Sequence, residues 1–173
     1  MKQFFIIFLL YFLVSSCSDR PDKSDLKSLL VGQVKNTHTT QGWFVPTNIA
    51  IKGLTAEQSN WKDSTENHSI GELVSHITFW SEMNLRSFKG EEMSNFDIDN
   101  EVTFKMYNDE EWQTAVKRLD SVQSQWEMTI EKATKEQLNE WSSEIANMTS
   151  HNAYHTGQIV YIRKRNGWWK KMH

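Results

Sequence analysis

The sequence of 173 residues contains only two prolines, seven glycines and one cysteine. Because proline and glycine interrupt helices, their scarcity favours a helical protein. A single cysteine excludes an intrachain disulfide. The formal net charge of −3 lacks the basic excess of a nucleic-acid-binding protein, so no nucleic-acid partner is expected. The length suits one domain, and a domain of this size buries roughly 70% of the surface that its unfolded chain exposes.

The longest apolar run, residues 4–14, is eleven residues long, whereas a membrane-spanning helix needs about 20. It follows a short basic start and fits the apolar region of a secretory signal. Ser15 and Ser16 then precede Cys17, an arrangement that resembles the lipobox of bacterial lipoproteins. The resemblance implies cleavage before Cys17 and lipidation of that cysteine, which would anchor the protein to a membrane. A plain signal peptide with an incidental cysteine is the alternative.

These features divide the chain into three parts. Residues 1–16 are the predicted lipoprotein signal peptide, and residues 17–24 are the lipidated cysteine with a polar tether. Residues 25–173 are the predicted folded domain. A lipoprotein signal places this domain outside the cytoplasm, in the cell envelope.

Hydrophobic residues recur at helical spacing in four long segments, which are residues 24–54, 70–89, 109–132 and 149–166. Gly42 and Pro46 are expected to bend or break the first segment. No segment shows a convincing strand alternation. Because each helix carries one apolar stripe, the helices bury these stripes best against one another. The predicted fold is therefore all-α, an antiparallel four-helix bundle.

Several predicted helix starts carry capping signals. A Ser or Thr followed three residues later by Glu or Gln can form a capping box, in which two backbone N–H groups are satisfied reciprocally. Such pairs begin at Thr55, Ser69 and Thr134, and Asn108 begins a close variant. The pairs at Thr55 and Thr134 are expected to start only short helical turns within connections.

Two histidines, His151 and His155, lie four residues apart in the last helical segment. Four residues turn a helix by about 40°, so both imidazoles leave the same face and can bind one metal ion. Helical projection also groups His76 with apolar residues of the second segment, which predicts that all three histidines point into the core. Three imidazoles with one open position are the ligand set of a reactive metal site.

Other interpretations of the histidines remain open at this point. One histidine on an apolar face is more often a hydrogen-bonded core residue, and three can form a metal-free polar network. Zincin metalloproteases carry Glu directly after the first histidine, but Asn152 stands there, which excludes that class. His38 is a weaker candidate to approach the site, and His68 is expected at the surface or in a connector.

With these residues in view, the chain resembles the DinB-like family, including its branch of metal-dependent thiol transferases. The similarity covers nearly all of residues 25–167. Its most specific part is the last motif, which contains both histidines and the Gly-Gln-Ile sequence that follows. The matching segments are residues 54–58, 69–76, 79–80, 89–91 and 151–159.

The resemblance implies a four-helix bundle that holds a divalent metal ion through three histidines. The histidines that match the family's motif are His76, His151 and His155, so the resemblance implies that these three are the ligands. The expected metal is zinc or nickel. Members of the family are often dimeric, so a homodimer is one expected assembly.

Three further residues are candidates to support the site. Gln158 lies on the ligand face and is expected to support a ligand or contact the substrate. Tyr154 is a second candidate for these roles. Glu72 lies one turn before His76 and could orient it, although its place in a capping box explains it equally well.

The family's characterised enzymes use low-molecular-weight thiols, which implies a metal-held thiolate that reacts with a small-molecule substrate. Those thiols are mainly cytoplasmic, whereas the predicted signal places this domain outside the cytoplasm. The expected function is a membrane-anchored metalloprotein with thiol-dependent transferase or hydrolytic chemistry. The alternative is a non-catalytic binding module of the envelope, in which the metal is structural or absent.

Overall fold

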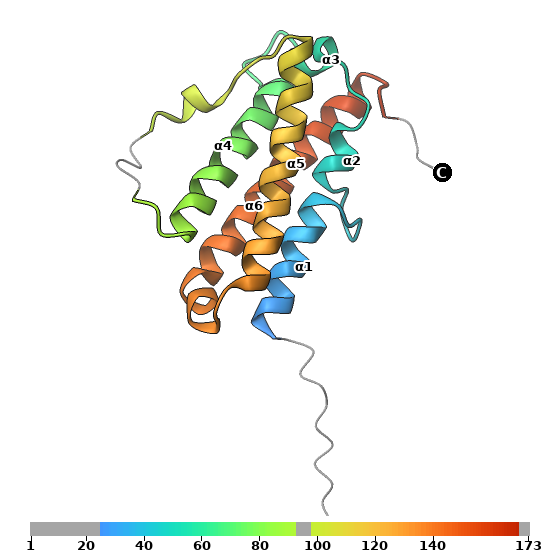
Figure 1. Cartoon of the computed structure of the whole chain (residues 1–173). Coiled ribbons are helices and arrows are strands. Elements are labelled where there is room, and N and C mark those ends of the chain that lie inside the picture. The colour runs from blue at the N-terminus through green and yellow to red at the C-terminus, as the bar shows by residue number, and fades with distance from the viewer. Residues whose placement is uncertain (1–24, 93–97, 170–173) are drawn as a thin grey trace, which may run out of the picture.

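The computed structural model describes residues 25–92 and 98–169. These residues form six α-helices and one short 3₁₀-helix, and they contain no strand (Figure 1). The predicted signal peptide, Cys17 and the tether lie outside the described residues. Among the helices that are described, none is long and apolar enough to cross a membrane.

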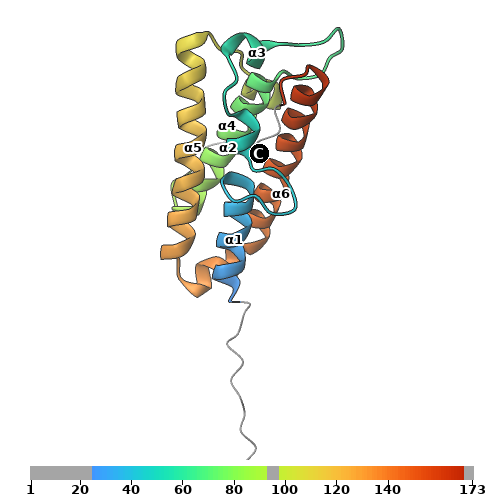
Figure 2. The ribbon, with the colours of Figure 1, turned by 90° about the vertical axis from the view of Figure 1, so that its right-hand side faces the viewer.

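Four long helices form a bundle, which confirms the predicted all-α fold. α1 packs against α5 and α6, and α4 packs against the same two helices, so α1 and α4 occupy diagonal corners (Figure 2). Helices α4 and α6 run in opposite directions, whereas α4 and α5 run in the same direction, because a long connection returns the chain to the top (Figure 1). The four helices are α1 (Leu26–His38), α4 (Ile70–Phe88), α5 (Asp109–Lys132) and α6 (Lys135–Arg165).

The first predicted segment is broken, as expected from Gly42 and Pro46. α1 ends at His38, and α2 (Thr47–Ile51) starts after Pro46, which occupies the N-cap position. The capping box at Thr55 then starts α3 (Ala56–Asn60). These short helices cover one end of the bundle, where α2 packs on α6 and α3 packs on α4 and α5.

The last helix is much longer than the expected segment 149–166, because α6 already begins at Lys135. Thr134 caps it by accepting a hydrogen bond from the backbone N–H of Gln137, 3.2 Å away. The side chain of Gln137 donates to the carbonyl oxygen of Phe88 instead of completing a capping box. Between Lys135 and Asn147 α6 buries only Leu138 and Ile145, and so sparse an apolar pattern does not predict a helix.

The predicted apolar stripe of α5 forms the centre of the core. Trp112 and Trp126 are each 1% exposed. Their indole N–H groups donate to the carbonyl oxygens of Leu54 and Ser81, each at 2.9 Å. A buried indole needs such a partner, so these bonds fix α5 against α4 and against the connection between α2 and α3. The remaining large residues of the stripe that are fully buried are Leu119, Val122 and Ile130.

Candidate metal centre

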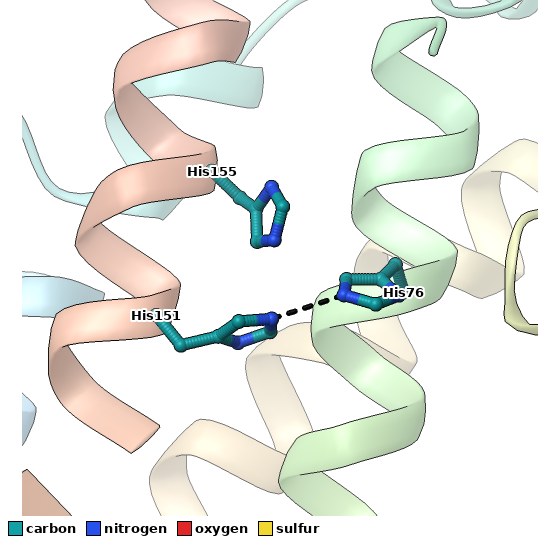
Figure 3. Close-up of side chains that lie close together, drawn as sticks. All are labelled: His76, His151 and His155. Carbon is teal, nitrogen blue, oxygen red and sulfur yellow. Dashed lines mark hydrogen bonds between the residues drawn. The ribbon is translucent and has the colours of Figure 1, made fainter. Parts of the chain in front are cut away.

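Three imidazole rings from two helices meet on one side of the bundle. His76 comes from the middle of α4, and His151 and His155 come from successive turns of α6 (Figure 3). One ring nitrogen from each residue lies within 4.8 Å of the other two. Nε2 of His76 and Nε2 of His151 are 3.0 Å apart. The fold therefore brings together the three residues that the sequence singled out.

The three rings differ in how deeply they are buried. His76 is 4% exposed, whereas His151 and His155 are half-buried. The expectation that all three point into the core is therefore correct only for His76. The buried stripe of α4 runs along Ile70, Val74, Ile77, Ser81 and Leu85, and that of α6 along Ile145, Asn152, Thr156 and Ile159. His151 and His155 flank the buried stripe of α6, which leaves these two rings accessible from outside, whereas His76 is buried on α4.

A cleft of about 690 Å³ lies directly over the rings. Helices α4 and α6 form two walls, and the connection that contains the 3₁₀-helix η1 (Asn100–Thr103) closes another side. A site of this size admits a small organic molecule. Besides the three histidines, the wall includes Trp80, Phe104, Glu144, Tyr154 and Gln158.

The outer nitrogen of His76 is held by Thr103, a residue that sequence reasoning missed. The Thr103 hydroxyl donates its single hydrogen to the carbonyl oxygen of Asn100, at 2.7 Å. It must therefore accept a hydrogen bond from Nδ1–H of His76, also at 2.7 Å. This contact assigns the hydrogen of His76 to Nδ1 and leaves the lone pair of Nε2 facing the other histidines.

The outer nitrogen of His155 has a similar partner. Its Nδ1–H donates to Oε1 of Gln158 at 2.6 Å, so Gln158 lies where the support of a ligand was expected. Nδ1 of His151 makes a longer contact of 3.4 Å with Oδ1 of Asn152. With each Nδ1 directed to a protein oxygen, all three Nε2 atoms remain available on the inner side.

The electrostatic surroundings keep these rings neutral. Burial, and then the charges that His151 and His155 would carry, lower the pKa of His76 to about 3. Burial also lowers the pKa of His151, with a further contribution from His155. The pKa of His155 is lowered chiefly by burial, against the opposing hydrogen bond to Gln158. Neutral imidazole is the form that binds a metal ion, so the cluster is prepared for binding near neutral pH.

A family model of the DinB superfamily matches residues 47–159. The chain belongs to the DinB superfamily. The matched region begins at α2, extends far into α6 and includes all three clustered histidines. No curated protein and no solved structure was found to match the chain.

The donor set of this DinB-superfamily domain fits a divalent ion. Nitrogen ligands at about 2.0–2.1 Å from a tetrahedral zinc ion stand about 3.3 Å apart. The separation of 3.0 Å between His76 and His151, and the limit of 4.8 Å for every pair, require only small side-chain rotations to match this value. Imidazole nitrogen suits zinc, nickel, copper and iron alike.

The other expected supporting residues lie as follows. Glu72 accepts the backbone N–H of Ser69 at 2.7 Å and an ammonium hydrogen of Lys62 at 3.1 Å, so it caps α4. No contact between Glu72 and His76 is present among the described residues. The ring of Tyr154 packs edge-on against His155, with 5.0 Å between the ring centroids, and most of the side chain is exposed to the cleft and solvent.

His68 lies in the connection between α3 and α4, as expected, and this connection places it in the wall of the cleft. Its ring stacks on Phe104 with 3.6 Å between centroids, and the other face of Phe104 stacks on His76 at 4.3 Å. Phe104 follows directly after η1, in a connection without hydrophobic periodicity. The sequence therefore held no signal that would place this ring, or Thr103, beside α4.

His38 lies outside the cluster and belongs to the α1–α5 interface. Its ring is 3% exposed. Nε2 lies 2.9 Å from a carboxylate oxygen of Asp120, and Nδ1 lies 2.7 Å from one of Glu127. Both ring nitrogens of His38 contact carboxylates of α5, so neither is directed to the histidine cluster.

Proposed function

We propose that this protein binds one divalent metal ion, zinc or nickel, through the Nε2 atoms of His76, His151 and His155. The observation that carries the proposal is the direction of the rings, since all three Nδ1 atoms meet protein oxygens and all three Nε2 atoms converge. In a metal-free polar network, a hydrogen bond between two of the Nε2 atoms would require one of the rings to carry a second proton. The lowered pKa values oppose any added proton there, which favours the metal.

We further propose that the centre acts on a small molecule in the cleft, as a thiol-dependent transferase. A divalent ion supplies Lewis acidity and lowers the pKa of a thiol or water beside it. Phe104 and Trp80 exclude water from one side of the cluster, and Glu144 is the carboxylate in the wall that can accept the thiol proton. The thiol sulfur then forms the new bond to the electrophile, whose leaving group departs with its electron pair.

Metal analysis of protein purified without a histidine tag tests the first proposal. Wild type is expected to carry one ion per chain, and His155→Ala is expected to lose most of it. His38→Gln is the matched control, because it also removes a histidine, and a more buried one, without touching the cluster. Equal metal content in wild type and His155→Ala would overturn the assignment.

A cobalt-substituted site tests the second proposal, since its visible spectrum reports directly on the ligands. A small thiol such as cysteine is expected to change the spectrum at a saturating concentration. The competing function is a binding module in which the ion only joins α4 to α6, and it is suggested by the origin of the ligands on these two helices. An unchanged spectrum, together with a large fall in Tm on metal removal, would favour that function.

We also propose that lipidation of Cys17 anchors the domain to a membrane of the cell envelope, with residues 17–24 as the tether. The support is the sequence of an apolar run, small residues and the sole cysteine. Expression of the full chain in a bacterium with labelled palmitate is expected to label wild type and leave Cys17→Ser unlabelled and detached from membranes. Wild type that is unlabelled would leave the plain signal peptide as the explanation.

A further inference from the structure

A second cavity, of about 360 Å³, lies between α2 and α5, and it shares no lining residue with the histidine cleft. Its wall is largely apolar, with Ile51, Leu54 and Leu119 among the contributing side chains. Trp112 presents only its hydrocarbon surface there, because its N–H group is already bonded to the carbonyl oxygen of Leu54. The cavity therefore offers a surface suited to an apolar group.

Two residues that line this cavity each carry a buried polar atom with no hydrogen-bond partner among the described residues. These atoms are Nε2 of Gln123, a donor, and Oδ1 of Asn48, an acceptor. The Gln123 side chain is 2% exposed, so its amide is withdrawn from bulk solvent. An unpartnered buried amide is costly, and a molecule that bonds to it recovers that free energy. A secondary amide can pair with both atoms, because it carries one hydrogen-bond acceptor and one hydrogen-bond donor.

The rim of the cavity adds positive charge. Lys52 and Lys117 both line it and are exposed, and neither forms an ion pair in the described part of the chain. The nearby carboxylate of Asp120 is already engaged by His38. An anionic group at the mouth is therefore favoured over a cationic one.

We propose that this cavity binds a small amphipathic molecule that combines an apolar group, a secondary amide and an anionic end, as an N-acylated amino acid does. Gln123 donates to the amide oxygen, Asn48 accepts the amide hydrogen, and the two lysines attract the anionic end. The apolar group lies against Trp112 and Leu119. This binding site is independent of the metal centre and of the function proposed for it.

Titration of N-acetyl-L-leucine into the purified ¹⁵N-labelled chain tests the proposal. The indole N–H signal of Trp112, assigned with Trp112→Phe, is expected to shift until saturation, whether or not metal has been removed. The matched compound 4-methylpentanoate keeps the branched chain and carboxylate but lacks the amide. It is expected to bind about tenfold or more weakly, because the two amide hydrogen bonds are lost.

Variants of the two amides complete the test. Gln123→Leu is expected to weaken binding of N-acetyl-L-leucine about tenfold without lowering Tm, since it replaces an unpartnered polar group by an apolar one. Asn48→Leu, at a half-buried position, gives a second measurement should Gln123→Leu fold poorly. Gln125→Leu is the control, because its side chain contacts Lys89 on the α4 side.

Three results would overturn the proposal. The first is the absence of a saturable shift, which would mean that only water occupies the cavity. The second is equal binding of 4-methylpentanoate and N-acetyl-L-leucine. The third is unchanged affinity in both amide variants.

Discussion

The hydroxyl oxygen of Thr103 lies 2.7 Å from Nδ1 of His76, and this contact joins the segment between α4 and α5 to the histidine cluster. The neighbouring backbone strengthens the link, because the hydroxyl of Ser75 donates to the carbonyl oxygen of Thr103 at 2.5 Å. Thr103 is 1% exposed, so solvent cannot replace its hydroxyl easily. The connection between α4 and α5 therefore sets the orientation of the His76 ring on α4.

Thr103→Val tests this relationship, because valine keeps the shape of threonine and removes the acceptor for Nδ1–H of His76. We expect metal affinity to fall about 10- to 100-fold, the usual effect of losing a hydrogen bond to a metal-bound histidine. Competition with a chelator of known affinity measures the change. Thr114→Val is the control, since that exposed hydroxyl donates only to the carbonyl oxygen of Glu110. Equal losses in both variants would contradict the role of Thr103.

Much of the fold follows from local sequence signals. The capping boxes at Ser69 and Thr55, and the variant at Asn108, form as their residue types require. The apolar residues of α5 are buried, as their helical spacing predicts. The sequence does not predict the start of α6, because the helix that Thr134 caps exposes most of its first turns and so shows no regular apolar spacing.

The histidine cluster was predictable from the sequence, but its surroundings were not. Two of the histidines share one helix, so a spacing of four residues fixes their relative position. Helical projection directs the third, His76, toward the core as well, and the resemblance to a known family assigns it to the same cluster. Thr103 and Phe104 reach His76 only through the path of an irregular connection, and no helical period constrains such a path. Half-burial of His151 and His155 likewise depends on where neighbouring helices lie.

The depressed pKa of His76 predicts a pH dependence of stability in the metal-free protein. The folded state holds His76 neutral down to about pH 3, whereas the unfolded chain binds a proton near pH 6.5. Because the unfolded state binds more protons in this range, stability is present above pH 6.5 and is lost as pH falls toward 3, by at most about 1.4 kcal/mol per pH unit. Urea unfolding after chelation measures this slope.

His76→Gln supplies the comparison for this measurement. Removing the titrating ring is expected to make the slope between pH 6.5 and pH 3 shallower, while the stability at neutral pH also changes through lost packing. Parallel pH profiles of the two proteins would show that His76 is protonated equally in the folded and unfolded states, against the expectation.

The Phe104 ring is expected to be one source of the burial of His76. Phe104→Ala removes the ring that stacks on His76 at 4.3 Å and opens this side of the imidazole to the cleft. Because burial is the largest cause of the lowered pKa, the pKa of His76 should rise toward 6.5. NMR titration of the His76 ring protons in metal-free protein follows this change. Phe79→Ala, on the same helix but outside the wall of the cleft, should leave the pKa of His76 nearly unchanged.

His38 offers a test that separates stability from metal binding. His38→Gln removes hydrogen bonds to Asp120 and Glu127 and is expected to lower the free energy of unfolding by about 1.5–3 kcal/mol, the range for hydrogen bonds to charged groups. Urea unfolding measures this loss, and metal analysis of the same sample should still find one ion per chain, because both ring nitrogens of His38 face α5. Loss of metal in the folded variant would mean that the α1–α5 interface controls the spacing of α4 and α6.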